Sequence, residues 1–262
     1  ITASYDTSVE FPISLTFNLN AESSADIVFI ILSYKISKIT TATVITEIEP
    51  EFAAGESVKT SWKLDMRMAG LPPGTEIQYR WTIEDAAGNR LETPWSIVQF
   101  DDERYRWNNL SEGKLSLFWY KGDSSFAREL LTAAREALLK LEQDTGAYLE
   151  QSVKLYIYAG SKDLRGALVY AQEWTGGIAF TEYSIVALGI APEDLVWGKR
   201  AIAHELAHMV IFQMTSNPYS GLPTWLDEGL ATYAEGDLDE NLQSLLTEAI
   251  SRDILISAQT LS

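Results

Sequence analysis

The first hundred residues alternate apolar and polar side chains in short stretches, which is typical of β-strands. Phe11, Ile13, Leu15, Phe17 and Leu19 fall on one face of an extended segment, because successive side chains of a strand point to opposite faces. Further stretches of this kind occupy residues 26–34, 41–48, 58–66, 76–84 and 95–100. Turn-forming residues rich in Gly, Pro and Asn separate them. Short strands at this spacing predict an antiparallel β-sandwich over residues 1–105.

One segment of this region resembles a known type of module. The stretch Tyr79-Arg-Trp-Thr-Ile-Glu-Asp-Ala-Ala-Gly-Asn is similar to the late strands of immunoglobulin-like or fibronectin type III modules. The resemblance implies an all-β amino-terminal domain of the immunoglobulin or fibronectin type III kind.

The pattern changes within the charged and aromatic residues 101–109, so we place a domain boundary between residues 101 and 112. Apolar residues then recur at helical spacing over 124–148. Strands are predicted at 153–158, 177–180 and 184–188, and helices at 162–172, 192–213, 225–234 and 238–252. This mixture predicts an α+β domain over residues 112–262.

Composition excludes several classes of function. The chain has 262 residues, and 37 acidic against 20 basic residues give a net charge of -17. So acidic a chain repels nucleic acid, and we expect no nucleic-acid partner. The absence of cysteine excludes disulfides and thiolate metal sites. No apolar run reaches the length of about 18 residues that a membrane span requires.

Both histidines of the chain lie in one short motif, Ile202-Ala-His204-Glu205-Leu-Ala-His208. Residues four apart share one face of a helix, so the two imidazoles could present nitrogens to one metal ion. Glu205 projects about 100° around the helix axis from His204, which suits a carboxylate that acts on water rather than on the metal. The alternative is a pair of histidines on an ordinary helix.

A third ligand is available twenty residues after His208. A catalytic zinc site uses three protein ligands and leaves one position open. Glu228, in the segment Trp225-Leu-Asp-Glu228-Gly-Leu-Ala, is the candidate that we favour, and Asp227 is the alternative. Both acids could instead merely favour the positive end of a helix that begins after Pro223.

These two segments together resemble the gluzincin metallopeptidases, the thermolysin-like and aminopeptidase-like enzymes, and most closely the peptidase MA-like domains. The resemblance is specific over about 195–236 and implies a thermolysin-like α+β zincin domain. It implies one Zn²⁺ held by His204, His208 and Glu228, with Glu205 as general base. It also implies that the segment containing Gly177, Ile178 and Ala179 is an edge strand that binds a peptide or protein substrate. A plain sheet edge is the alternative for that strand.

The chain departs from the family pattern at two places. Thermolysin-like enzymes have an acid four residues after the glutamate ligand, where this chain has Thr232, so no partner is assigned to orient a histidine. The group that stabilises the oxyanion is also unassigned. We interpret Tyr233 as a helix packing residue, and the other candidates are Tyr170, Tyr183 and Tyr219. Glu235 and the acids at 237–240 are interpreted as solvated charge near the start of the last helix.

The sequence therefore predicts a zinc-dependent peptidase. The main alternative is a catalytically degenerate zinc-binding envelope protein that acts as a binding or adhesion module, and a structural zinc site is a third hypothesis. We expect the catalytic domain to continue past Ser262, because domains of this family generally run beyond such a point. We also expect a secreted or cell-envelope protein, with any membrane anchor outside residues 1–262. No feature of the sequence indicates an oligomeric state.

Overall fold

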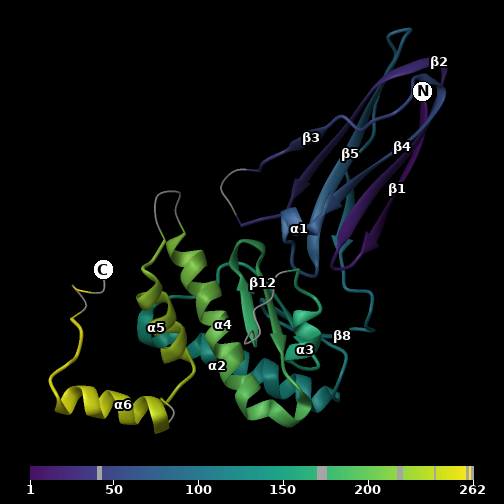
Figure 1. Cartoon of the computed structure of the whole chain (residues 1–262). Helices are drawn as coiled ribbons and strands as arrows, with labels where there is room; N and C mark the ends of the chain where they lie inside the picture. Colours follow the sequence, from purple (N-terminus) through teal and green to yellow (C-terminus); the bar gives the residue numbers. More distant parts are fainter. Residues whose placement is uncertain (40–42, 170–175, 217–220, 239, 258–259, 261–262) are drawn as a thin grey trace. The chain divides into compact units, whose positions relative to one another are not determined.

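The structure is a computed structural model that describes residues 1–39, 43–169, 176–216, 221–238, 240–257 and 260 (Figure 1). The chain divides into two units. The first comprises residues 1–106 together with the segment that starts at Arg165, and the second comprises residues 107–164 and the described residues from 176 onward.

The first unit is rich in β-structure, as the alternating pattern predicts. Its elements are β1 (Thr2–Glu10), β2 (Ser14–Ile36), β3 (Thr46–Ile48), β4 (Gly55–Asp65), the one-turn helix α1 (Met66–Ala69), β5 (Thr75–Asp85), β6 (Arg90–Glu92) and β7 (Ser96–Phe100). All of its strand pairs are antiparallel. Residues 41 and 42, which begin one predicted strand, lie outside the described residues, and β3 covers the end of that segment.

The long strand β2 organises this unit. Its first half pairs with β1 and β4, its second half pairs with β3 and β5, and the register shifts between Glu22 and Ile27. An irregularity of this kind lets one strand change partners. The two strands predicted at 11–19 and 26–34 are therefore the two halves of β2. Of the residues predicted to share one face, Leu15, Phe17 and Leu19 lie in β2 and are buried, whereas Ile13 lies in the preceding turn and is 50% exposed.

The second unit combines a mixed sheet with helices. Its elements are β8 (Asn108–Glu112), β9 (Leu115–Trp119), α2 (Ser124–Thr145), β10 (Val153–Tyr158), α3 (Ser161–Arg165), β11 (Gly177–Phe180), β12 (Ile185–Gly189), α4 (Leu195–Thr215), α5 (Thr224–Ala234) and α6 (Glu240–Ser251). The strand order is β11-β12-β10-β9-β8. The three central strands are parallel, and each outer strand is antiparallel to its neighbour.

The predicted helices of this region are largely confirmed. α2 begins after Asp123, whose carboxylate accepts hydrogen bonds from the backbone N–H groups of Ser125 and Phe126, an N-cap that satisfies otherwise unpaired donors. It ends at Gly146 in the left-handed conformation. The helix predicted at 162–172 corresponds to α3, which ends at Arg165. Residues 170–172 of that prediction lie outside the described residues.

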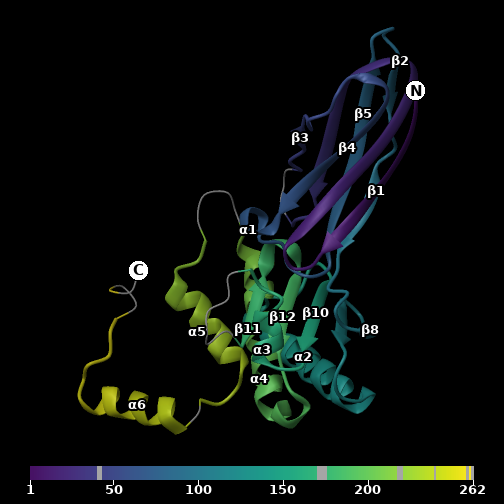
Figure 2. The same ribbon diagram turned by 45° about the vertical axis from the view of Figure 1, so that its right-hand side comes forward.

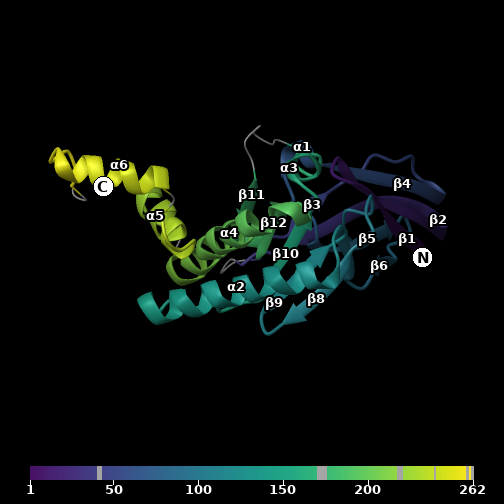
Figure 3. The same cartoon turned by 90° about the horizontal axis from the view of Figure 1, so that it is seen from below.

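The core of the second unit lies between the sheet and the helices α2 and α4. Figure 3 shows these two helices side by side, and α4 also contacts β11, β12 and α5. The buried cluster contains sheet residues such as Leu117, Leu155 and Leu188 and helix residues such as Leu130 and Leu206. Because α4 is apolar on most of its surface, it can be covered by the sheet, α2 and α5 at once.

The position of α4 next to the end of the sheet matters most for the site. β11 is the terminal strand on that side, and Figure 2 shows β11, β12 and β10 in sequence beside the helices. At the start of α4, Gly198 lies against Ile190, where a Cβ atom would come within 2.4 Å of the isoleucine side chain. The absent side chain lets α4 lie close to the segment that follows β12.

The last helix stands apart from this core. α6 extends away from the sheet in Figures 1 and 2, and its residues Leu242, Leu245 and Ile250 are exposed. Among the helices that the structure describes, none combines the length and the hydrophobicity that a bilayer crossing requires.

Candidate metal centre

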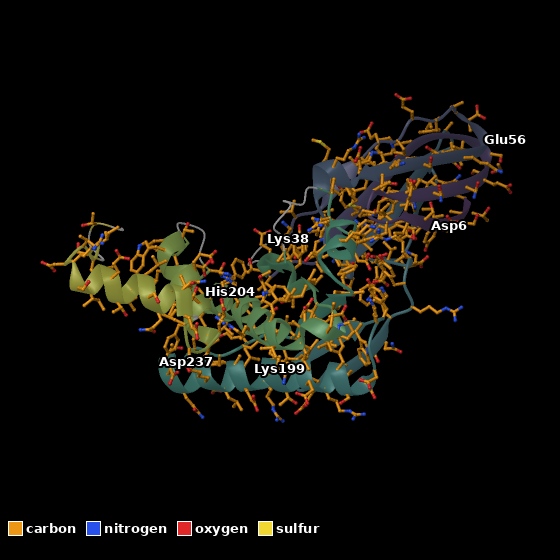
Figure 4. All side chains as sticks on the ribbon, turned by 60° about the horizontal axis from the view of Figure 1, so that its bottom comes forward. Asp6, Lys38, Glu56, Lys199, His204 and Asp237 are labelled. Atoms are coloured by element: carbon orange, nitrogen blue, oxygen red, sulfur yellow. The ribbon has the colours of Figure 1, made fainter. Side chains whose placement is uncertain are left out.

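The two histidines lie on one face of α4, one turn apart, as the four-residue spacing predicts. Their ring centroids are 4.9 Å apart, and the two Nε2 atoms are 3.2 Å apart. Both side chains are partly buried, at 22% exposure for His204 and 13% for His208. Figure 4 labels His204 on α4, with Lys199 nearer the start of the same helix.

Glu228 approaches this pair from α5, which packs against α4. Its Oε2 atom lies 3.4 Å from His204 Nε2 and 3.8 Å from His208 Nε2. One ligand atom from each of the three side chains therefore lies within 4.8 Å of the other two. Among the described residues, this is the set of histidines and acids that could hold a metal ion. The structure thus brings together the three ligands that the sequence predicts.

The other nitrogen of each imidazole contacts an acid. His204 Nδ1 lies 2.8 Å from Glu235 Oε1, and His208 Nδ1 lies 3.1 Å from Asp227 Oδ2. An ionised carboxylate only accepts hydrogen bonds, so the Nδ1–H tautomer of a neutral imidazole is the one that suits these two contacts. Each Nε2 is then left with a lone pair.

This arrangement fits a metal ion. Two Nε2 lone pairs and a carboxylate oxygen converge on one point, and such a set of acceptors repels itself unless a cation lies between them. Two imidazole nitrogens and one carboxylate oxygen are also a ligand set that zinc uses in catalytic sites, with a fourth position open. The residues present therefore fit Zn²⁺.

Glu205 is not one of the three residues of this cluster; its carboxylate contacts the strand β11 instead. A Cβ atom at Gly177 of β11 would lie 2.7 Å from Glu205 Oε1, so the strand passes directly against the carboxylate. The backbone N–H of Ala179 donates a hydrogen bond to Glu205. Burial raises the pKa of the Glu205 carboxyl above its ordinary value, and the two neighbouring imidazoles and the Ala179 N–H act in the opposite direction.

The open side of β11 faces this carboxylate. The backbone N–H of Gly189 donates to the carbonyl of Gly176, at 2.9 Å, so that pair is hydrogen-bonded across the two strands. Hydrogen-bonded and non-bonded pairs alternate in an antiparallel ladder. The N–H and C=O groups of Gly177 and Ala179 therefore point away from β12, while Ile178 pairs with it. The predicted edge strand is an edge strand in the structure; its substrate role stays a prediction.

The structure bears on the alternative metal ligand and on the candidate tyrosines. Asp227 contacts the outer nitrogen of His208 and is not part of the ligand cluster, which favours Glu228 as the ligand. The Tyr233 hydroxyl donates to Asp144 on α2, and Lys140 lies over its ring, so Tyr233 packs against α2. Tyr170 and Tyr219 lie outside the described residues.

Sequence reasoning missed Glu235. It was interpreted as solvated, but its side chain is only 21% exposed and contacts both His204 and Arg200. Glu235 follows Glu228 by seven residues, close to two helical turns, and this spacing was the signal that could have identified it.

The comparisons with known proteins concern the same region. Residues 133–262, from within α2 to the end of the chain, match the model of the Peptidase MA superfamily. Among curated proteins, none matches the chain.

Solved structures resemble the chain only distantly. An aminopeptidase N family protein from Idiomarina loihiensis is 10% identical with a TM-score of 0.40, and the match covers 89% of this chain and 54% of that one. A carbohydrate-binding module of family 56, a β-1,3-glucan-binding domain, is 16% identical with a TM-score of 0.25, over 38% of this chain and 100% of that one. A laminaripentaose-producing β-1,3-glucanase from Paenibacillus barengoltzii is 17% identical with a TM-score of 0.27, over 47% and 27%. At these scores the likeness carries no argument about function, and the family match at residues 133–262 stands as the informative finding.

We predict that the purified protein binds one zinc ion and that His204→Ala weakens this binding by more than about 100-fold, because a ligand is lost. Binding should also weaken in acid, since protons compete with the metal ion for the imidazole nitrogens. Competition titration with a chromophoric chelator measures both effects. Glu193→Gln, at an exposed acid outside the cluster, is the control. Wild-type affinity in the His204→Ala protein would contradict the site.

Proposed function

We propose that the second unit is a zinc-dependent peptidase that hydrolyses bonds of a peptide or protein substrate. The observation that carries this proposal is the position of Glu205, which lies between the cluster of three ligand atoms and the open edge of β11. A structural metal site has no need of a buried carboxylate beside the ion. The match of residues 133–262 to the Peptidase MA superfamily supports the same proposal.

His204, His208 and Glu228 would hold the ion, and zinc in such a site supplies Lewis-acid chemistry that polarises a carbonyl and makes water nucleophilic near neutral pH. Glu205 acts as general base. Its carboxylate takes a proton from the attacking water and passes that proton to the leaving amine, while a C–O bond forms and the amide C–N bond breaks. A raised pKa suits this role, because a base that also returns the proton works best with a pKa near the working pH.

The edge of β11 can align the substrate with this chemistry. An extended peptide that pairs with the outward N–H and C=O groups of Gly177 and with the C=O of Ala179 would lie alongside Glu205, which itself accepts from the Ala179 N–H. Gly177 contributes through its missing side chain, since any Cβ atom there would meet the Glu205 carboxylate. We therefore propose Gly177, Ile178 and Ala179 as the substrate-binding strand.

The main rival is a domain that binds zinc and a partner but has no activity. It shares every ligand with the peptidase hypothesis and differs only in whether Glu205 moves a proton. Turnover therefore separates the two hypotheses, and metal content does not.

We propose an immunoglobulin-like or fibronectin type III-like identity for the first unit, supported by its antiparallel strands and its buried Trp81. A secreted or cell-envelope location is proposed on the combination of such a module with a peptidase.

We predict that Glu205→Gln lowers the hydrolysis of casein and of fluorogenic peptides about 10²–10⁴-fold, because the general base is lost. Zinc content should be unchanged, because Glu205 is not among the ligand atoms. Steady-state assays and metal analysis on the same preparations measure the two effects. Wild-type protein that holds zinc and cleaves none of these substrates would favour the rival instead.

We predict that Gly177→Ala also lowers hydrolysis, by about 10²-fold, because displacement of a catalytic group by about 1 Å has effects of this size. Zinc affinity should stay at the wild-type value, since the added methyl group meets Glu205 and Leu188 rather than a ligand. The matched control is Gly221→Ala, where a Cβ atom meets nothing within 4 Å. Full activity in the Gly177→Ala protein would show that the strand does not set the position of Glu205.

A further inference from the structure

Arg200 and His204 of α4 both contact Glu235, the residue at the end of α5. Arg200 Nη2 donates to Glu235 Oε2 at 2.9 Å, and His204 Nδ1 lies 2.8 Å from Glu235 Oε1. Each oxygen of the carboxylate thus has its own partner, and both partners belong to α4. We propose that Glu235, held by Arg200, is a positioning residue that fixes the tautomer and the orientation of His204 for metal binding. The inference rests on the proposed zinc site.

The spacing of residues along the two helices explains why these side chains meet. Arg200, His204 and His208 follow one another at intervals of four residues, which places them in a row along one face of α4. Glu228 and Glu235 are seven residues apart, so they lie within about 20° of each other around α5. The small residue Ala231, which is fully buried between them, lets α5 lie close to α4. The two rows then face each other, and Glu235 falls opposite Arg200 and His204.

Glu235 constrains its imidazole more strongly than Asp227 constrains the other one. Asp227 contacts His208 at 3.1 Å through a side chain that is 36% exposed. Glu235 is less exposed and makes a shorter contact, and its second oxygen is occupied by a guanidinium. A carboxylate that is held at both oxygens has little freedom to rotate, so the position of His204 Nδ1–H is set by the protein.

The tautomer of His204 decides whether it can be a ligand at this point. In a neutral imidazole one nitrogen carries the hydrogen and the other has the lone pair. Only the Nδ1–H form directs a lone pair from Nε2 toward Glu228 and His208. Outer partners of this kind orient ligating histidines and raise their basicity. Glu235 therefore supplies this function from the C-cap of α5, three residues after Thr232.

The chain offers a direct test because His204 and His208 are its only two histidines. A long-range ¹H–¹⁵N spectrum of the metal-free protein at about pH 8, where free imidazole is neutral, reports the tautomer of each ring. We expect Nδ1–H for both rings in the wild type. Glu235→Ala should convert His204 to a mixture of the two tautomers and leave His208 unchanged. Retention of the pure Nδ1–H form by His204 in this variant would overturn the proposal.

Zinc affinity provides a second measurement that needs no catalytic activity. Glu235→Ala should weaken zinc binding about 10–100-fold, the usual effect of removing such a partner, and Glu235→Gln should weaken it less because an acceptor oxygen remains. Glu129→Gln is the matched control. It removes the carboxylate that pairs with Lys199, the residue before Arg200 on α4, and it changes no contact of a histidine. Thermal unfolding of the metal-free proteins shows which variants fold. If Glu235→Ala does not fold, Glu235→Gln replaces it in both measurements.

The outcomes separate this inference from the proposed function. If Glu235→Ala lowers the unfolding temperature as Glu129→Gln does but leaves zinc affinity at the wild-type value, Glu235 is merely structural and the proposal is wrong. If the wild type binds no zinc, the proposed function fails, and the tautomer spectrum still decides whether Glu235 fixes His204. A tautomer change together with weaker zinc binding supports the proposal whether or not peptides are cleaved.

Discussion

The candidate site depends on one electrostatic constraint, the convergence of two imidazole lone pairs and a carboxylate on a single point. The Nδ1 atoms of His204 and His208 each lie next to an acid, and their Nε2 atoms, 3.2 Å apart, both lie near Glu228. Such an arrangement is unfavourable unless a cation completes it. The surrounding packing has to hold these groups together, because each of the three would otherwise turn toward water.

The fold meets this requirement with few elements. The helix α4 is packed on the sheet and on α2, which fixes the two histidines, and α5 lies against α4 with Glu228 and Glu235 on its contact face. On the other side, β11 is the last strand of the sheet and passes against Glu205 at Gly177. His204, Glu205 and His208 therefore share one short stretch of α4, and Glu228 of α5 and the open edge of β11 lie beside it. The proposed zinc chemistry, proton transfer and peptide alignment would require this proximity.

Local features of this protein could be predicted from the sequence, and features that depend on distant contacts could not. The spacing of His204, Glu205 and His208 and the helical period of α2 are visible within a few residues. The union of two predicted strands into β2 was missed, because a register shift between Glu22 and Ile27 depends on partner strands. Glu235 was missed for a related reason. Its environment is decided by the packing of α5 on α4, whereas Asp237 and Glu240, which follow it closely in sequence, are exposed.

The central claim is that a single zinc ion is held by two imidazoles and one carboxylate. X-ray absorption at the zinc edge of the stoichiometric complex measures this directly. The account predicts four-coordinate zinc with two imidazole nitrogens at about 2.0–2.1 Å and oxygen ligands at about 2.0–2.2 Å. A spectrum without imidazole scattering, or with a shell of six oxygens, would contradict it.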